Sequence, residues 1–264
     1  MSRFRSISSR HNELVARFRA AARGDEEGVL LLDGKHLLAE AVACKLELGH
    51  VMVSTEGPLD DDVRPLLDQL WRGGIDIVEA TPPVMAAVSP VRTPSAVVAL
   101  AVRPPPANLF AAEAPLIVIA CDVQDPGNIG AIIRVAEAAG AAGLVAAGQS
   151  ADPFGWKALR GSMGSALRLP MTIERRPEDA IIEARRHGCR IAATVPRDGD
   201  PLFGADLSGP IALLVGGEGA GLSDDMIQMA DQRITIPMRA PVESLNAAVA
   251  AALVLYEARR GRHQ

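Results

Sequence analysis

The last quarter of the chain contains the stretch Ile234-Thr-Ile-Pro-Met238, followed after a short polar turn by Ser244-Leu-Asn246 and a long alanine-rich segment. The β-branched residues of the first part are typical of a strand that ends at its proline. Ser244 is a natural helix cap, because its hydroxyl can accept a hydrogen bond from a backbone N–H at a helix start. Apolar residues then recur at helical spacing and predict a helix with one buried face: Leu245, Val249, Leu253 and Tyr256.

The composition around this stretch is that of a globular protein with a substantial core. The chain has 264 residues, of which 48% are hydrophobic and 22% charged, and this length predicts one or two domains. No apolar run is long enough for a membrane span, and the N-terminus lacks the apolar core of a secretory signal. The three cysteines are far apart, which favours a cytoplasmic protein without a disulfide framework or a metal site: Cys44, Cys121 and Cys189.

The distribution of charge matters more than the net charge of -5, which argues weakly against a strongly electrostatic nucleic-acid binder. Residues 1–23 are locally basic, with Glu13 as their only acidic residue. A solvated helix surface and a phosphate-contacting surface both explain this pattern, and the two readings stay open. The basic residues are Arg3, Arg5, Arg10, Arg17, Arg19 and Arg23.

Strands and helices alternate in the first hundred residues, which predicts a small α/β domain over residues 1–102. Proline cannot continue a central strand, so the triple proline after Arg103 places a linker at residues 103–112. The predicted helices cover 8–23, 35–46 and 63–72, and the predicted strands cover 28–33, 50–54, 75–78 and 95–102.

The alternation continues over residues 113–264 and predicts a second α/β domain. Its strands are near-continuous apolar runs, as expected of a parallel sheet that helices cover on both faces. The predicted strands cover 115–121, 143–147, 171–173, 190–195 and 211–215, and the predicted helices cover 128–139 and 178–187.

A first junction between strand and helix carries Asn128, Gly130 and Arg134 in the pattern Asn-x-Gly-x-x-x-Arg. Asn128 can cap the helix, and Arg134 lies one turn beyond Gly130 on the same face. A helix N-terminus with these side chains suits an anionic group such as a phosphate. A capped amphipathic helix with a solvated arginine explains this motif equally well when it is taken alone.

A second junction is glycine-rich and runs from Gly216 to Gly221, with Glu218 inside it. Glycines at a strand end permit a tight turn and close approach of a ligand. The spacing does not fit a dinucleotide fingerprint, and no Gly-Lys-Ser/Thr follows, so a nicotinamide-dependent enzyme and a P-loop are excluded. Glu218 is interpreted either as a carboxylate at a helix start or as a site residue. These two junctions, and the third one after Ile234–Met238, all lie at the carboxyl ends of predicted strands, where parallel sheets bind ligands.

The motifs, taken in this order, resemble those of SpoU-type RNA 2′-O-ribose methyltransferases of the SPOUT superfamily. The resemblance covers about residues 113–260 and rests on the first two junctions together with Ile236-Pro-Met238 and Ser244-Leu-Asn246. Residues 1–100 resemble, more loosely, the small RNA substrate-binding domain that precedes the catalytic domain in this family. Asp33-Gly34 stands there where Glu-Gly is usual.

The resemblance implies a deep trefoil knot in the C-terminal domain, a pocket for S-adenosylmethionine formed by the knot, and a homodimer without a metal ion. The cofactor would contact Thr194, Gly216, Gly217, Ile236, Met238 and Leu245. The catalytic and RNA-facing set would be Asn128, Arg134, Glu218, Ser244 and Asn246.

The family mechanism makes the arginine of the first motif, here Arg134, a general base. Because a guanidinium stays protonated in proteins, we favour a hypothesis in which Arg134 grips the adjacent phosphate and stabilises the developing alkoxide. Asn128 and Asn246 would orient the ribose, and Glu218 would hold Arg134 or the pocket wall.

The predicted substrate is structured RNA, with rRNA first and tRNA second. A non-catalytic RNA-binding relative would have the same fold but no need for an intact catalytic set. Aromatic residues make up only 3% of the chain, so phosphate, 2′-OH and shape contacts are expected to dominate recognition. The candidate RNA surfaces are the basic helix at 8–23 and the stretch Lys157–Arg168.

Overall fold

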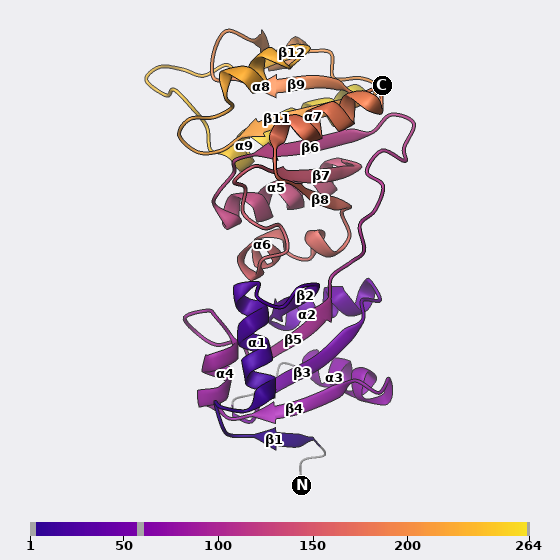
Figure 1. Ribbon diagram of the computed structural model, residues 1–264, viewed down its shortest axis with the longest axis vertical. Helices are drawn as coiled ribbons and strands as arrows, with labels where there is room; N and C mark the ends of the chain where they lie inside the picture. The colour runs from indigo at the N-terminus through magenta and orange to yellow at the C-terminus, as the bar shows by residue number, and fades with distance from the viewer. Residues whose placement is uncertain (1–3, 57–60, 263–264) are drawn as a thin grey trace. The chain divides into compact units, whose positions relative to one another are not determined.

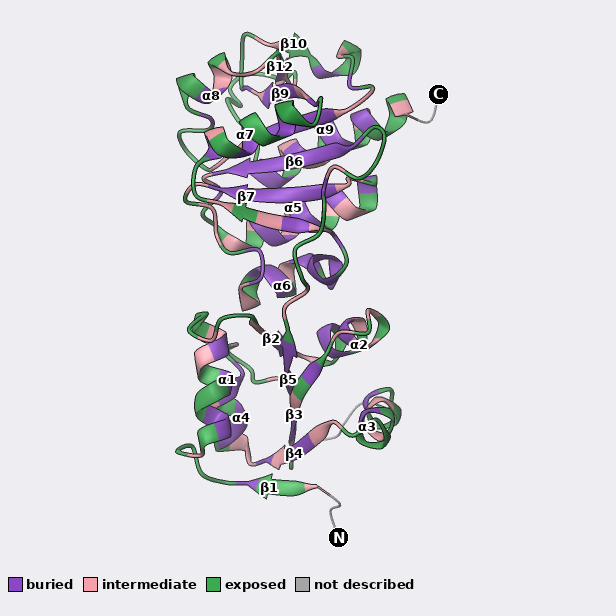
Figure 2. Cartoon of the chain, turned by 45° about the vertical axis from the view of Figure 1, so that its right-hand side comes forward, coloured by how far each residue is buried: buried purple, intermediate pink, exposed green. Residues whose placement is uncertain are grey.

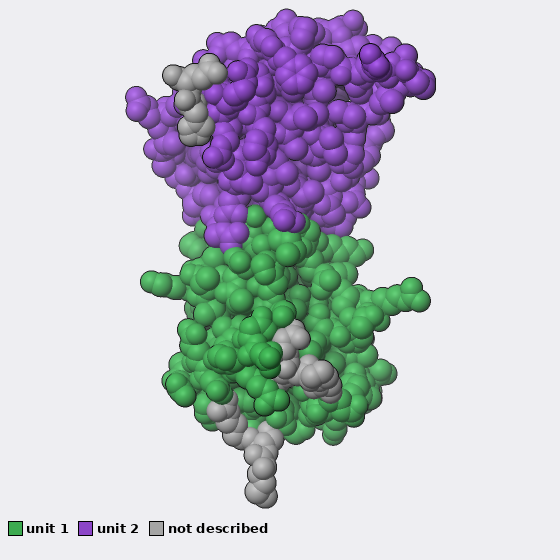
Figure 3. Space-filling view, turned by 180° about the vertical axis from the view of Figure 1, so that it is seen from behind, with its two compact units in different colours: residues 1–105, 154–167 green, residues 106–153, 168–264 purple. Residues whose placement is uncertain are grey.

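The computed structural model describes residues 4–56 and 61–262. It divides into two compact units, which Figure 3 shows in different colours. Unit 1 contains residues 1–105 and 154–167, and unit 2 contains residues 106–153 and 168–264. The membership of 154–167 in unit 1 was not foreseen from the sequence, where these residues lie inside the second predicted domain.

Unit 1 is built on a five-stranded mixed sheet in the order β1-β4-β3-β5-β2 (Figure 1). The strand β5 runs antiparallel to both of its neighbours, whereas β1, β4 and β3 are parallel to one another. The bounds are β1 (Arg5–Ile7), β2 (Val29–Asp33), β3 (Leu48–Ser54), β4 (Asp76–Ala80) and β5 (Val97–Val102). Of these, β1 was not predicted.

Helices cover both faces of this sheet (Figure 2). α1 (Glu13–Arg23) and α4 (Pro82–Val88) pack on one face through a core that includes Phe18 and Met85. α1 begins after Asn12, whose side chain caps it, and not at residue 8. The remaining elements of unit 1 are α2 (Lys35–Ala43), α3 (Val63–Arg72), α6 (Trp156–Ser162) and η1 (Ser165–Leu167).

Unit 2 is built on a seven-stranded parallel sheet in the order β10-β12-β9-β11-β6-β7-β8. The central strands are buried along their whole apolar length, as the near-continuous apolar runs predicted. The bounds are β6 (Leu116–Cys121), β7 (Gly143–Ala147), β8 (Met171–Glu174), β9 (Arg190–Thr194), β10 (Asp200–Pro201), β11 (Ile211–Gly216) and β12 (Gln232–Thr235).

Helices also lie on both faces of the second sheet (Figure 2). α7 (Pro177–Arg186) packs on one face through Ala180, Ile181 and Ala184. α5 (Pro126–Ala139) and α9 (Ala247–Arg262) pack against each other on the opposite face. The shorter elements are η2 (Leu202–Gly204) and α8 (Asp224–Gln228).

The buried face of α9 differs from the predicted one. Leu245, Val249, Leu253 and Tyr256 are between 37% and 52% exposed, so the prediction that this stripe is buried in the chain is wrong. The buried face is the alanine-rich one: Ala247, Ala248, Ala251, Val254, Leu255 and Ala258. Small side chains let α9 approach α5 closely, and this close fit leaves the larger side chains outside.

The predicted class, an α/β protein with a parallel sheet in its C-terminal part, is confirmed. The trefoil knot and the division into domains at 102 and 113 stay predictions. No helix within the described residues is long and apolar enough to cross a membrane. Among the same residues, no group of three or more His, Cys, Asp or Glu side chains is placed to hold a metal ion.

Candidate active site

Three loops of unit 2 follow β6, β11 and β12 and carry the motif residues. β6 and β11 are neighbours, and their last residues, Cys121 and Gly216, pair in register. The loop after β6 leads into α5, the loop after β11 contains Glu218, and the segment after β12 leads into α9. Because all three strands are parallel, these loops emerge at the same edge of the sheet.

A chain of hydrogen bonds joins one side chain from each loop. The Nδ2 group of Asn128 donates to Oε1 of Glu218, and Nδ2 of Asn246 donates to Oδ1 of Asn128 at 2.9 Å. These residues lie 90 and 118 positions apart in the sequence. The predicted convergence of the three motifs at one place is therefore present in the structure.

The direction of this hydrogen-bond chain follows from its position at the start of α9. Oδ1 of Asn246 accepts hydrogen bonds from the backbone N–H groups of Ala248, at 3.0 Å, and Val249, at 3.3 Å. Since the oxygen faces the helix, the amide nitrogen of Asn246 must face Asn128, which presents its own oxygen. The amide nitrogen of Asn128 is then the group left to donate to Glu218.

Asn246, and not Ser244, therefore caps α9, and the predicted cap was wrong. Ser244 is exposed, and no hydrogen bond of its side chain is found within the described residues. Both residue types accept a cap hydrogen bond well, so residue type alone could not decide between them. The helix starts later than predicted, at Ala247, and this start brings the side chain of Asn246 to the cap position.

The cap of α5 also differs from the prediction. Asp125 caps this helix, because its Oδ1 accepts a hydrogen bond from the backbone N–H of Asn128 at 2.8 Å. Asn128 lies inside the first turn, and its side chain is consequently free to join Glu218 and Asn246. The sequence held a signal for this arrangement, since proline at the first helical position, here Pro126, favours a cap at the residue before it.

Arg134 lies on α5 six residues beyond Asn128, which is about 9 Å along the helix axis at about 1.5 Å per residue. Its side chain is exposed, and no ion pair or hydrogen bond of its guanidinium is found among the described residues. The suggested contact between Glu218 and Arg134 is thus absent there, and Glu218 contacts Asn128 instead. The guanidinium is available to an external anion.

Gly216, which ends β11, and Gly217, which follows it, are required by the packing of the chain itself. A Cβ on Gly217 would lie 2.0 Å from the carbonyl oxygen of Asp122, and one on Gly216 would lie 2.5 Å from the carbonyl carbon of Gly221. Both obstacles are backbone atoms, which cannot move aside as a flexible side chain can. The sequence predicted that these glycines allow a ligand to approach closely. In the structure they already allow the neighbouring backbone of Asp122 and Gly221 to approach closely.

The segment after β12 combines partly exposed apolar side chains with backbone groups for which no partner is found in the described chain. Ile236 and Met238 are half-buried, and Leu245 is 37% exposed. Among residues 238–245 of the described chain, one backbone hydrogen bond is found: the N–H of Val242 donates to the carbonyl oxygen of Arg239 at 3.1 Å. Apolar side chains beside free N–H and C=O groups suit a purine ring with a polar edge.

Thr194 is engaged within the sheet. Its hydroxyl donates to the Leu214 carbonyl on β11 at 2.9 Å, and its side chain is half-buried. This hydrogen bond uses the one donor of the hydroxyl, so a ligand could meet only its oxygen lone pairs.

Cys121, which ends β6, is unsuited to act as a nucleophile. Burial, followed by the nearby carboxylates of Asp122 and Glu178, raises the pKa of its thiol to about 12. The thiol therefore stays protonated at neutral pH, and the thiolate is the reactive form of cysteine. Chemistry at this edge rests on the amide, carboxylate and guanidinium groups.

Comparison with known proteins agrees with this fold. An AdoMet-bound rRNA methyltransferase from Sinorhizobium meliloti superposes with a TM-score of 0.84 over 98% of both chains, at 28% identity. The SpoU methyltransferase AviRb from Streptomyces viridochromogenes, in complex with AdoMet, gives a TM-score of 0.83 over 95% of this chain and 98% of its own, at 30% identity.

Sequence relatives match over most of the chain as well. The 23S rRNA (guanosine(2553)-2′-O)-methyltransferase RlmP of Bacillus subtilis is 31% identical over 87% of this chain and 88% of its own. An uncharacterised tRNA/rRNA methyltransferase of Synechocystis is 32% identical over 97% of this chain and 93% of its own.

The fold and the joined motifs define an RNA methyltransferase of the parallel-sheet α/β type. A model of the SpoU rRNA Methylase family matches residues 115–256, and the chain belongs to that family.

Proposed function

We propose that this protein transfers a methyl group from S-adenosylmethionine to a ribose 2′-hydroxyl of rRNA in the cytoplasm. The observation that carries the proposal is the hydrogen-bond chain from Asn246 through Asn128 to Glu218, which keeps residues of all three motifs in one arrangement. A non-catalytic RNA-binding relative would have no use for this arrangement. The names of the relatives favour rRNA as the substrate and keep tRNA as the alternative.

The cofactor would be held by the segment after β12 and by the turn after β11. Ile236, Met238 and Leu245 offer apolar contacts to the adenine ring, and the backbone groups between them offer hydrogen bonds to its edge. Gly216 and Gly217 would form the neighbouring wall with their backbone, and Thr194 would contribute at most a lone pair. When bound, the cofactor supplies a methyl group on a sulfonium, which a hydroxyl oxygen can attack in line.

The residues of the chain would then act mainly by positioning. Arg134 would bind the phosphate next to the target ribose with its free guanidinium and would stabilise negative charge that develops on the attacking oxygen. Asn128, whose amide is fixed at both ends, would orient the ribose, and Asn246 and Glu218 would hold Asn128 in place. Ser244, exposed beside this set, would face the RNA.

We further propose that the protein works as a homodimer through the exposed stripe on α9. Val249, Leu253 and Tyr256 are 48%, 39% and 52% exposed and follow one another at helical spacing, which places them on one face. The opposite face of α9 is already buried against the rest of unit 2. A second copy of the chain is therefore the partner that would cover the stripe. Val242 and Leu245, which precede α9 in the chain, are 53% and 37% exposed and are further apolar side chains that the same partner could cover.

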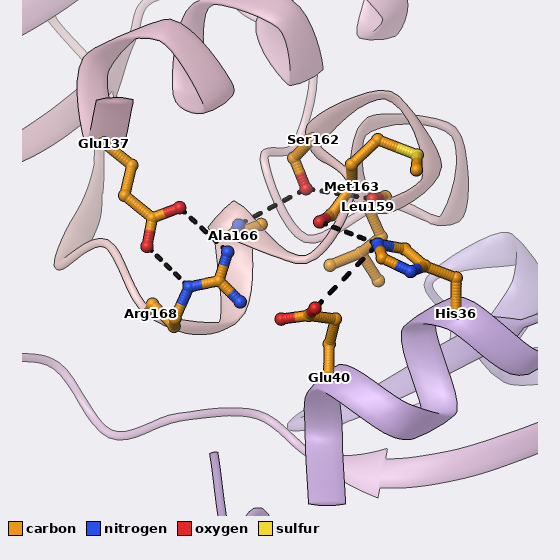
Figure 4. Close-up of polar contacts among 8 residues, drawn as sticks. All are labelled: His36, Glu40, Glu137, Leu159, Ser162, Met163, Ala166 and Arg168. Carbon is orange, nitrogen blue, oxygen red and sulfur yellow. Dashed lines mark hydrogen bonds and ion pairs between the residues drawn. The ribbon is translucent and has the colours of Figure 1, made fainter. Parts of the chain in front are cut away.

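The basic surfaces named from the sequence are in part neutralised by ion pairs within each unit. Arg17 pairs with Glu26 at 2.7 Å, and Arg23 pairs with Asp25 at 2.6 Å. Arg19 is exposed, with no partner found in the described chain, and would be the first phosphate contact to test. Arg3 lies outside the described residues. In unit 2, Arg168 pairs with Glu137 at 2.6 Å (Figure 4).

The first test incubates the protein with methyl-labelled S-adenosylmethionine and separate pools of unmodified rRNA and tRNA. Label that survives alkaline hydrolysis in a dinucleotide would establish 2′-O-methylation, and the pool that contains it would name the substrate. The variant Asn128→Ala is expected to lower kcat about 100-fold, because Glu218 and Asn246 both lose their hydrogen bond to residue 128. Asn108→Ala, in an exposed stretch without helix or strand, is the matched control. Cofactor binding without label in either pool, in intact wild-type protein, would contradict the proposed substrates.

A further inference from the structure

Unit 1 contains a cavity of about 330 Å³ that none of the predicted site residues lines. It lies between the first turn of α2, Val63 at the start of α3, the residues that lead into β5, and two residues of the segment 154–167, Arg160 and Met163. Its volume is at the lower end of the range of about 300–1,000 Å³ for small-molecule sites, so it suits a group of roughly nucleoside size.

The floor of the cavity is apolar. Leu37, Val63 and Val97 line it and are at most 4% exposed, whereas Met163 remains 42% exposed at the wall. Met163 has a left-handed backbone with φ of 52°, and its carbonyl lies 3.1 Å from Nε2 of His36 (Figure 4). A non-glycine residue in this conformation is uncommon, and the His36 ring contacts its carbonyl oxygen. A flat heterocycle could pack against this floor and the methionine side chain.

One wall of the cavity carries a fixed cation. The carboxylate of Asp33 is fully buried and accepts hydrogen bonds from Ser89, at 2.7 Å, and from Ser95. Nη1 of Arg160 donates to the same carboxylate at 3.0 Å, and the Arg160 side chain is 43% exposed. A buried carboxylate is costly unless it is paired and hydrogen-bonded, so Asp33 holds Arg160 firmly at the cavity wall.

The guanidinium of Arg160 keeps N–H groups for a ligand. A guanidinium has five N–H donors, and within the described chain the ion pair to Asp33 is the one polar contact found for this side chain. Lys35 at the same cavity pairs with Asp62 at 3.2 Å, so the charges around the cavity nearly cancel. A nearly neutral, apolar cavity with spare N–H donors fits an uncharged heterocycle with acceptor atoms on its edge better than a phosphate.

We propose that this cavity binds one unpaired nucleobase of the substrate RNA, other than the base of the methylated nucleotide, and that Arg160 reads its acceptor edge. The inference rests on the proposed function for the identity of the ligand as RNA. Guanine is the preferred base, because its O6 and N7 atoms match the fork of an arginine. Unpaired bases are the usual targets of sequence-specific recognition of RNA. A cavity that encloses one base would compensate for the small number of aromatic side chains on which bases could stack.

The first arm of the test is kinetic and uses two alanine-to-leucine variants of unit 1. Ala96 is exposed and lines the cavity, so Ala96→Leu fills it without removing a side-chain contact. Ala86 is exposed on α4 away from the cavity, and Ala86→Leu is the matched control. With in-vitro transcribed 23S rRNA, Ala96→Leu is expected to raise KM for RNA about tenfold, whereas kcat and the affinity for S-adenosylmethionine stay as in the wild type.

The variant Arg160→Lys keeps the charge beside Asp33 but loses the fork, and it is expected to raise KM for RNA in the same manner. Unchanged KM in both Ala96→Leu and Arg160→Lys, in protein that methylates rRNA, would overturn the inference while the proposed function stands. A fall in kcat with KM unchanged would also overturn it, because such a fall indicates a structural effect on the catalytic unit.

The second arm needs no methyl transfer. In protein with ¹³C-labelled methionine methyl groups, the Met163 signal is followed by NMR during titration with GMP, AMP, CMP and UMP, and buried Met226 of unit 2 is the internal control. We expect a saturable shift of the Met163 signal that is largest with GMP and absent in Ala96→Leu. A Met163 signal that no nucleotide moves would refute the inference. A shift in protein that methylates no RNA would refute the proposed function alone.

Discussion

The substitution Gly217→Ala tests whether the glycine turn after β11 is set by the packing of the chain or by a ligand. The added Cβ would lie 2.0 Å from the Asp122 carbonyl oxygen and 2.7 Å from the Asp122 carbonyl carbon. Carbon and oxygen atoms of neighbouring strands approach to about 3.3 Å, so β6 and β11 would have to separate locally by about 1.3 Å. Because both obstacles are backbone, this movement would open the end of the ladder at Cys121 and Gly216.

The expected cost can be compared with that of a neighbouring glycine. Forced overpacking of this kind costs about 3 kcal/mol, the upper part of the usual range. Gly219 has φ of +87° with nothing within 4 Å of an added Cβ, so Gly219→Ala carries only the strain of the left-handed backbone. That strain is about 1 kcal/mol. Unit 2 is of a size at which each kcal/mol lowers Tm by about 2–4 °C, which predicts a fall of about 6–12 °C for Gly217→Ala.

Differential scanning calorimetry of both variants and the wild type would measure these shifts, and titration calorimetry would measure the affinity for S-adenosylmethionine. Both tryptophans lie in unit 1, so tryptophan fluorescence would follow the wrong unit. We expect Gly217→Ala to lose both stability and affinity, and Gly219→Ala to lose little stability. A Gly217→Ala protein that unfolds at the wild-type temperature but no longer binds the cofactor would refute the reasoning, because the glycine would then serve the ligand alone.

Three further predictions concern other parts of unit 2. Arg134→Lys is expected to lower kcat about 100-fold with unchanged cofactor affinity, and near-full turnover that rises with pH would contradict the phosphate-binding role. Because burial raises the pKa of Cys121 from 9.0 to about 12, its contribution to stability is present below pH 9 and is lost as the pH rises towards 12. In chemical unfolding, the free energy of unfolding should therefore fall less between these pH values for Cys121→Ala than for the wild type. Equal falls in the two proteins would contradict this. Leu253→Glu is expected to convert a dimer into a monomer in analytical ultracentrifugation, and a dimer that persists would argue against the α9 interface.

The strands of unit 2 could be predicted closely because each is an apolar run with clear ends. The central strand predicted at 115–121 spans Leu116–Cys121, and the one predicted at 211–215 spans Ile211–Gly216. The helix α6 was missed, since the glycine and serine residues from Arg160 to Ser165 are typical of a loop. In the structure Ala158 and Leu159 are buried, so tertiary packing overrides the local preference.

The sequence could also predict which residues belong to the site, but not which side chains contact one another. Two helix starts each offered two good caps, and the prediction chose Asn128 and Ser244 where the structure uses Asp125 and Asn246. The alternatives differ by two or three residues in the helix start, a precision that residue preferences do not reach. Each error has a consequence for the chemistry, because a side chain that caps a helix with its oxygen has a fixed orientation towards the site.

The burial of the α9 stripe could not be predicted from the sequence either. The stripe also connects the proposed dimer with the proposed active site. Periodicity predicts that a face is apolar, yet it cannot specify whether that face is covered by the same chain or by a second copy. Asn246 caps α9 and begins the hydrogen-bond chain to Asn128 and Glu218, while Val249 on the exposed stripe donates a backbone N–H to the same asparagine. A partner that packs on the stripe would therefore hold the helix start that orients Asn246. The proposed homodimer would therefore stabilise the start of α9, which orients the side-chain amide of Asn246 and, through it, that of Asn128.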